Sequence, residues 1–310
     1  MQEDHFTYTA NDGASIFIYK WVTDATAAPK AVVQIAHGMA EHSARYGDFA
    51  AALVDAGYFV FANDHRGHGQ TAGSLDKVGY FADQDGWQHV LNDMHGITKL
   101  LQTEYPDTPI FLFGHSMGSF LTRHFIFQYP RAVQGAILSG TGGDPGVLGR
   151  VGAAIAKIES KIRGRKARSA LMTALSFRRF NNAFKPNRTE FDWLSRDESA
   201  VDKYIEDPFC GNVFTAGFFN DLLAGIREIN KEDNIRKIPK DFPLYLFAGG
   251  NDPVGDNGKG VQQVYETYRK AGISDVSCKL YPEGRHEMLN ETNRGNVFQD
   301  VIAWLDDHCP

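Results

Sequence analysis

The Gly-His-Ser-Met-Gly pentapeptide at residues 114–118 constrains the fold of this chain more than any other segment. It follows an apolar run at 109–113 and precedes a segment with helical character at 119–128. A serine flanked by glycines in a strand-to-helix turn is the pattern of a nucleophile elbow, which exposes the hydroxyl in a cleft at the carboxyl end of a sheet. Glycine suits both flanking positions because the tight turn leaves no space for a side chain. Ser116 is therefore the predicted nucleophile, and the backbone N–H of Met117 is predicted to face the atom that it attacks.

A serine hydroxyl becomes a nucleophile only when a neighbouring base accepts its proton, so an acid and then a histidine should follow later in the chain. The apolar stretch 243–248 is typical of a buried strand, and Asp252 lies in the loop after it. The next predicted strand, 276–281, is followed by a loop that contains His286. Asp256 is the rival acid, and Asp252 could also be a turn aspartate before proline. His308 lies in the terminal helix, which leaves His286 as the predicted base.

Ester hydrolysis also requires two N–H donors directed at the oxygen that becomes negatively charged. Met117 offers the first donor. The second should come from the loop after the early strand 31–36, where Met39 follows Gly38. Gly38 is expected to let the backbone pass close to the substrate, and the side chain of Met39 is expected to form only a wall.

Two further motifs accompany the elbow. Residues 37–46 match H-G-x-x-E-H-x-x-R-Y, and residues 64–69 match D-x-R-G-H-G. Together with the G-H-S-M-G elbow, these motifs resemble the monoacylglycerol lipases and lysophospholipases in order and spacing over residues 30–140 and 240–310. Between these regions, only 191–197 and 207–211 resemble bacterial lysophospholipase-like relatives. The resemblance implies an α/β-hydrolase fold, carboxylic ester hydrolysis and no metal or cofactor.

The composition predicts a cytoplasmic enzyme. A net charge of −6 argues against a nucleic-acid partner, which usually requires a basic face. No apolar run reaches the roughly 18 residues needed to cross a membrane, and the acidic start of the chain is unlike a signal peptide. Three widely spaced cysteines, Cys210, Cys278 and Cys309, are expected to be free thiols in a reducing compartment.

The predicted elements alternate between strand and helix after an antiparallel hairpin at 5–10 and 15–22, which is joined by Asn-Asp-Gly. Six more strands are predicted at 32–36, 58–62, 110–114, 135–139, 244–248 and 276–281. Helices are predicted at 45–56, 87–104, 117–128, 258–271 and 293–307. This order indicates an eight-stranded, mostly parallel sheet flanked by helices, as in the α/β-hydrolase fold. We expect residues 1–140 and 241–310 to form the core and residues 141–240 to form an inserted helical cap, because one crossover helix needs far fewer residues.

Part of the predicted cap is amphipathic, with apolar residues at Leu148, Val151, Ile155, Ile158 and Ile162. We expect Ile155 and Ile158 to bind the acyl chain of a substrate, either as the wall of a tunnel or while packing onto the body. Nearby lysines and arginines suggest a second possibility, peripheral contact with an anionic membrane. A simple solvated helix face explains the same basic residues and is the interpretation that we prefer for them.

These observations predict a serine ester hydrolase acting on acyl monoesters, of monoacylglycerol lipase or lysophospholipase type. Short-chain carboxylesterase, thioesterase and aminopeptidase activities on the same fold remain open, as does a non-catalytic binding protein. An aspartate would replace Ser116 in a dehalogenase or epoxide hydrolase, which excludes those reactions. The spacing of His37, His42, His65 and His68 fits no common zinc pattern, so no metal is expected.

Overall fold

The computed structural model describes residues 1–23 and 28–309, with only the backbone at 177 and 178. Within these residues, eight strands form one sheet in the order β1-β2-β4-β3-β5-β6-β7-β8. The β1–β2 and β2–β4 pairings are antiparallel, whereas all pairings from β4 through β8 are parallel. The predicted eight-stranded, mostly parallel sheet is therefore confirmed. The strands are β1 Gln2–Thr9, β2 Ser15–Val22, β3 Val32–Ala36, β4 Phe59–Asn63, β5 Ile110–His115, β6 Gly135–Ser139, β7 Leu244–Gly249 and β8 Val276–Tyr281.

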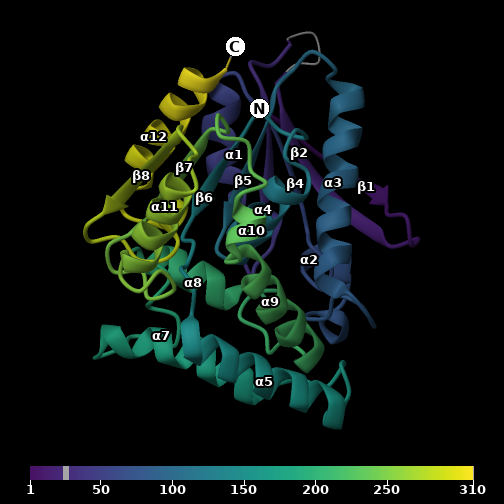
Figure 1. Cartoon of the computed structure of the whole chain (residues 1–310), viewed down its shortest axis with the longest axis vertical. Coiled ribbons are helices and arrows are strands. Elements are labelled where there is room, and N and C mark those ends of the chain that lie inside the picture. Colours follow the sequence, from purple (N-terminus) through teal and green to yellow (C-terminus); the bar gives the residue numbers. More distant parts are fainter. Residues whose placement is uncertain (24–27, 310) are drawn as a thin grey trace.

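Helices cover both faces of this sheet (Figure 1). One face packs against α1 Gly47–Asp55 and α12 Arg294–His308, and the other packs against α3 Gly86–Glu104, α4 Met117–Gln128, α9 Ala216–Ile229 and α11 Lys259–Lys270. Successive side chains of a strand point to opposite faces. In β5, Phe111 and Phe113 therefore join the core on the α1 side, while Ile110 and Leu112 join the core on the α3 side. Burial on both faces explains why the central strands are continuous apolar runs.

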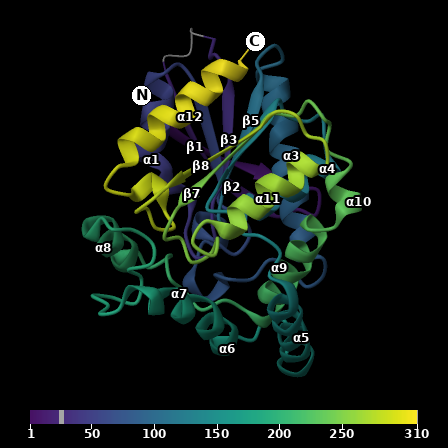
Figure 2. The ribbon, with the colours of Figure 1, turned by 60° about the vertical axis from the view of Figure 1, so that its left-hand side comes forward.

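The segment between β6 and β7 extends beyond the body at the end opposite the two termini (Figures 1 and 2). It contains the long helix α5 Gly146–Arg163 and the shorter elements α6 Ala170–Thr173, α7 Arg179–Asn181 and α8 Glu198–Glu206. Helix α9 then returns to the body and packs on α3 and α4, where Gly225 allows close approach of the Trp87 ring. The small helices α2 Gly69–Ala72 and α10 Glu232–Ile235 complete the fold. Over the described residues, every helix is too short or too polar to span a bilayer.

Candidate active site

The turn between β5 and α4 places Ser116 at the carboxyl end of the sheet. Its backbone has φ 51° and ψ −118°, a strained conformation for a residue with a side chain. A hydrogen bond of 2.9 Å from the Ser116 N–H to the Ser139 carbonyl fixes the turn to β6. Glycine is required on both sides, because a Cβ at Gly114 would collide with the first turn of α4, and a Cβ at Gly118 would collide with the Ala36 carbonyl.

The loop after β3 passes directly beside this serine. A Cβ added to Gly38 would lie 3.2 Å from the Ser116 Cβ and 2.7 Å from Glu41 Oε1, so only glycine allows this approach. The Gly38 N–H donates to Glu41 Oε1 at 2.6 Å. His37 supports the same loop: its Nδ1–H donates to the Gly38 carbonyl at 2.7 Å, while Nε2 accepts from the His65 N–H at 2.9 Å. Both nitrogens of His37 are therefore used in holding loops together.

Asp252 and His286 meet at the same end of the sheet. Asp252 lies in the loop after β7 and His286 in the loop after β8, and both side chains are buried. His286 Nδ1 lies 2.9 Å from Asp252 Oδ1 and 3.0 Å from Oδ2. The carboxylate also accepts the Val254 N–H at 2.9 Å, which holds it in place. Asp256, the rival acid in the sequence, is exposed and stands in the following turn.

The protonation of His286 is set by opposing effects. Burial lowers the pKa of the imidazole, but the charge of Asp252 and its hydrogen bond outweigh burial and raise the pKa above its ordinary value. Neighbouring His115 differs, because burial lowers its pKa to about 3 and its ring lies 4.7 Å from that of His286. His115 is therefore neutral at physiological pH, and its Nδ1 lies 3.2 Å from the Ser139 hydroxyl.

A buried ion-pair network, which the sequence reasoning missed, connects the Gly38 loop to the His286 loop. Arg45 pairs with Glu41 at 2.7 Å and binds both carboxylate oxygens of Glu287 at 2.6 Å. Burial would raise the pKa of Glu287, but Arg45 overcomes this effect and lowers it to about 2. Burial dominates at Glu41 and raises its pKa. The H-G-x-x-E-H-x-x-R-Y motif contained the signal, since it includes Glu41 and Arg45 at helical spacing.

The segment between β6 and β7 also holds these loops, through contacts that the sequence did not reveal. The backbone N–H of His286 donates to the Trp193 carbonyl at 3.3 Å, and the Glu287 N–H donates to the Leu194 carbonyl at 2.7 Å. The indole ring of Trp193 lies 5.1 Å from the imidazole of His286. Tyr204 donates from its hydroxyl to the Ala40 carbonyl at 2.9 Å. Residues of this segment therefore position both site loops.

These groups surround a cavity of about 300 Å³. Ser116 and His286 line it together with Gly38, Met39 and Met117, so the cavity brings together all the predicted site residues except Asp252, Ile155 and Ile158. Asp252 lies behind His286. Most other lining side chains are apolar and come from the interval 120–254, including Phe120, Met172, Phe180, Trp193, Leu194, Phe219, Leu222, Leu223, Ile226 and Val254. Such an apolar cavity with few convergent polar groups is typical of a small-molecule site.

Neither Ile155 nor Ile158 lines this cavity, so the structure does not bring these two predicted substrate-binding residues together with Ser116. Ile158 is 57% exposed on the outer face of α5, and Ile155 packs partly into the core. Helix α5 packs on α9 through a face whose fully buried residues are Ala156 and Ser160. The larger apolar side chains of α5 therefore do not point toward the cavity. The residues that line the cavity come instead from α6, α9 and the segment around Trp193.

Comparison with known proteins establishes the family. A family model described as serine aminopeptidase, S33, matches residues 27–293. The chain belongs to this family. It is 30% identical to monoglyceride lipase from Homo sapiens over 303 residues, covering 95% of this chain and 88% of the relative. It is 27% identical to monoacylglycerol lipase from Mycolicibacterium smegmatis over 300 residues, covering 96% and 94%.

A solved structure of a thermostable carboxyl esterase from Bacillus coagulans, in complex with glycerol, matches the S33-family chain with a TM-score of 0.92. The two share 27% identity, and 100% of both chains is covered. The predicted fold and enzyme class are confirmed: this S33-family member is an α/β hydrolase and a carboxylic ester hydrolase. The similarity to the two lipases also spans residues 141–240, where the motifs alone gave little support.

The contact between Asp252 and His286 leads to a prediction for this S33-family enzyme. We expect His286 to titrate above the ordinary value of 6.5, because the carboxylate stabilises the imidazolium more than burial destabilises it. In Asp252→Asn the burial effect is unopposed by that charge, so the pKa should fall below 6.5. NMR titration of labelled histidine measures both values. Asp256→Asn is the matched control and should leave the pKa unchanged; an equal pKa in the wild type and Asp252→Asn would contradict the assignment.

Proposed function

We propose that this enzyme hydrolyses monoacylglycerols, with Ser116 as nucleophile, His286 as general base and Asp252 as the residue that orients the histidine. The observation that carries the proposal is the buried Asp252–His286 hydrogen bond beside Ser116 in an apolar cavity. The similarity to monoglyceride lipases over most of the chain supports the choice of ester. A lysophospholipid is the alternative acyl monoester.

In the proposed reaction, Ser116 Oγ attacks the ester carbonyl carbon while His286 Nε2 accepts the hydroxyl proton. Asp252 keeps the proton of His286 on Nδ1 and stabilises the imidazolium that forms. The N–H groups of Met39 and Met117 bind the oxyanion, since both residues line the cavity beside the serine. His286 then passes its proton to the departing glycerol oxygen. Water, deprotonated by the same histidine, attacks the acyl-enzyme and releases the fatty acid.

The dimensions of the cavity favour a substrate with one acyl chain. A volume of about 300 Å³ lies at the lower end of the range for ligand pockets, roughly 300–1,000 Å³. Its apolar lining by α9 and by residues around Trp193 suits a hydrocarbon chain, which gains about 0.8 kcal/mol per buried methylene. Three chains would not fit together. Short-chain carboxylesters use the same polar groups and remain the second candidate, supported by the match to a carboxyl esterase.

An aminopeptidase reaction is less compatible with the charges in the cavity, although the family description contains that activity. An aminopeptidase needs a free carboxylate to hold the N-terminal ammonium group of its substrate. Glu41 and Glu287 are the acidic side chains among the described lining residues, and both are paired with Arg45. Binding an ammonium group there would require breaking these buried ion pairs, which is costly.

The proposed mechanism predicts that Ser116 and His286 act as one unit. Ser116→Ala and His286→Ala should each lower kcat by about 10⁴- to 10⁶-fold, and the double variant should lose no more than the stronger single variant. Steady-state hydrolysis of a monoacylglycerol measures these losses, and circular dichroism verifies folding. Retention of a tenth of the activity in Ser116→Ala would contradict the mechanism. Labelling with a fluorophosphonate separates this enzyme from a binding protein that carries a contaminating esterase. An active serine hydrolase is labelled at Ser116, whereas a binding protein is not.

The cavity predicts a dependence on chain length. Leu223→Trp should fill part of the pocket on α9, so a long acyl chain loses burial of two or more methylenes, worth about 1.6 kcal/mol or tenfold in kcat/KM. Esters of two or four carbons should keep their rates. Ala224→Trp, at an exposed position on the same helix, is the control and should change neither. Equal losses on short and long esters in a folded Leu223→Trp variant, or strong triacylglycerol hydrolysis by the wild type, would contradict the one-chain cavity.

We also propose that residues 141–240 act as a cap that contacts a lipid surface. Helix α5 turns its bulky apolar side chains outward: Leu148, Val151, Ile158 and Ile162 are all more than half exposed, with Ile162 at 77%. Leu171 and Leu175, later in the same segment, are also exposed, and the last turn of α5 carries Lys161 and Arg163. Exposed apolar side chains next to basic ones suit the boundary of an anionic bilayer. We further propose a cytoplasmic location, in which the cap would face such membranes.

The lipid-contact proposal predicts a difference between two forms of substrate. The Ile158→Asp/Ile162→Asp variant should hydrolyse monoacylglycerol in anionic vesicles at least about tenfold more slowly, because charged groups at the interface oppose insertion. Hydrolysis of a dissolved butyrate ester should not change, since neither side chain lines the cavity. Leu280→Asp, at an exposed apolar position on β8, serves as control. Unchanged rates on vesicles would contradict membrane contact by α5.

A further inference from the structure

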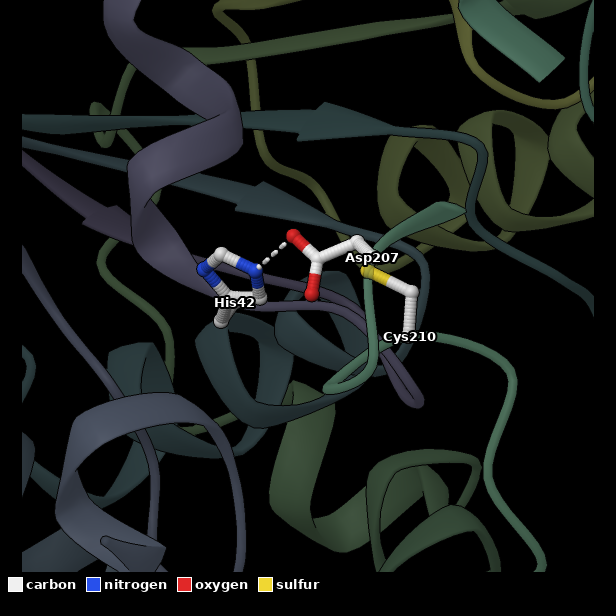
Figure 3. Close-up of side chains that lie close together, drawn as sticks. All are labelled: His42, Asp207 and Cys210. Carbon is white, nitrogen blue, oxygen red and sulfur yellow. Dashed lines mark hydrogen bonds and ion pairs between the residues drawn. The ribbon is translucent and has the colours of Figure 1, made fainter. Parts of the chain in front are cut away.

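A cluster of three potential metal ligands lies outside the proposed catalytic groups. The imidazole of His42, the carboxylate of Asp207 and the thiol of Cys210 place one ligand atom each within 4.8 Å of the others. Among the described residues, no other group of three His, Cys, Asp or Glu side chains brings its ligand atoms this close together. Figure 3 shows that His42 comes from the loop after β3, whereas Asp207 and Cys210 come from the connection between α8 and α9.

The three side chains are already held in position for a common ligand. His42 Nε2 lies 2.8 Å from Asp207 Oδ2. The other oxygen, Oδ1, accepts the Phe209 N–H at 2.8 Å, and the Cys210 N–H donates to the Asp207 carbonyl at 3.0 Å. This turn therefore directs Oδ2 toward the His42 imidazole, and Cys210 is a free thiol on the same turn. Bond lengths to zinc of about 2.0–2.3 Å require ligand atoms to be separated by several ångströms, which small side-chain adjustments would achieve here.

We infer that His42, Asp207 and Cys210 form a binding site for one Zn²⁺ ion. One nitrogen, one carboxylate oxygen and one sulfur are all ligand types that zinc accepts, and a water molecule would complete four-coordination. Binding replaces the thiol S–H bond with a sulfur–zinc bond and releases the thiol proton to solvent. The proton that His42 Nε2 shares with Asp207 moves to Nδ1 of the same ring, so that Nε2 can bind the ion. The expectation of no metal from the sequence rested on the spacing of four histidines and on the family resemblance. It did not consider Asp207, which lies 165 residues beyond His42.

The surroundings of the cluster allow a cation to enter. Arg45 is the positive charge that acts on Cys210, and its charge is balanced by Glu41 and Glu287. Asp207 also lines an open pocket of about 290 Å³ that includes Asp48 and Asp197. Lys203 and Arg294 line the same pocket, and Arg294 pairs with Asp197 at 2.9 Å. The pocket therefore has mixed charge and connects Asp207, one of the three ligands, with solvent.

A bound ion would join two segments that already touch at this place. The Ala40 carbonyl accepts the Gly211 N–H at 3.0 Å. Ala40 lies two residues before His42, and Gly211 directly follows Cys210. Zinc at the cluster would therefore fix the loop that contains Gly38 and Met39 to the segment between β6 and β7. An ion that binds only the folded chain must stabilise it, so the site should also appear as an increase in Tm.

The test uses the full chain, freed of metal with a chelator that is then removed. Calorimetric titration with ZnCl₂ should give one ion per chain, with Tm rising as zinc is added. Titration with Co²⁺ should give a thiolate-to-cobalt charge-transfer band that zinc abolishes. Cys210→Ser and Asp207→Asn should each weaken zinc binding at least about tenfold, because loss of even an outer-shell partner typically costs 10- to 100-fold. The cobalt band should vanish in Cys210→Ser.

Cys278→Ser is the matched control, because Cys278 is another free, partly buried thiol away from the cluster. It should bind zinc with the affinity of the wild type. Absence of saturable binding to the wild type would overturn the site, as would equal affinities in the wild type, Cys210→Ser and Asp207→Asn. Thermal unfolding without metal verifies that both ligand variants are folded, and Asp207→Asn keeps a side chain that can still hydrogen-bond to His42.

Discussion

The guanidinium of Arg45 is the group on which the geometry of the site depends. It pairs with Glu41, whose other oxygen accepts the Gly38 N–H, and it binds both oxygens of Glu287, the neighbour of His286. One buried cation therefore fixes the loop after β3 relative to the loop after β8. Removal of one partner from such a network leaves an uncompensated buried charge, which typically costs about 3–5 kcal/mol. This network of buried ion pairs and hydrogen bonds therefore sets the distance between the Gly38 backbone and His286.

The sheet supplies the second constraint. Parallel strands bring the ends of β3, β5, β7 and β8 to one edge, so short loops from distant parts of the sequence meet there. The tight turn at Ser116 requires glycine at position 118, because a Cβ there would lie 1.9 Å from the Ala36 carbonyl oxygen. The backbone strain at Ser116 is tolerated because the strand before it and the helix after it are both buried.

Much of this arrangement could be predicted from the sequence. Continuous apolar runs located the parallel strands within a residue or two, and the order of Ser116, Asp252 and His286 led to the groups that the structure brings together. The outer face of α5 could not be predicted, because periodicity shows which residues share a face but not which face meets the body. Small Ala156 and Ser160 turned out to be the buried side. The contacts of Trp193 with His286, and of His42 with Asp207, join residues about a hundred or more apart and depend on tertiary packing alone.

The backbone bonds from His286 to Trp193 and from Glu287 to Leu194 have a consequence for protein engineering. Exchange of substrate-binding segments between related enzymes would naturally replace the whole interval between β6 and β7. That exchange would remove the carbonyls of Trp193 and Leu194, which hold the histidine loop. It would also remove Tyr204, whose hydroxyl donates to the Ala40 carbonyl. The transferable module is shorter: a chimera that exchanges 146–190 and keeps 191–229 retains these supports and the packing of α9 on the body. The boundary for recombination therefore follows the hydrogen bonds to the active-site loops, and not the ends of the sheet strands.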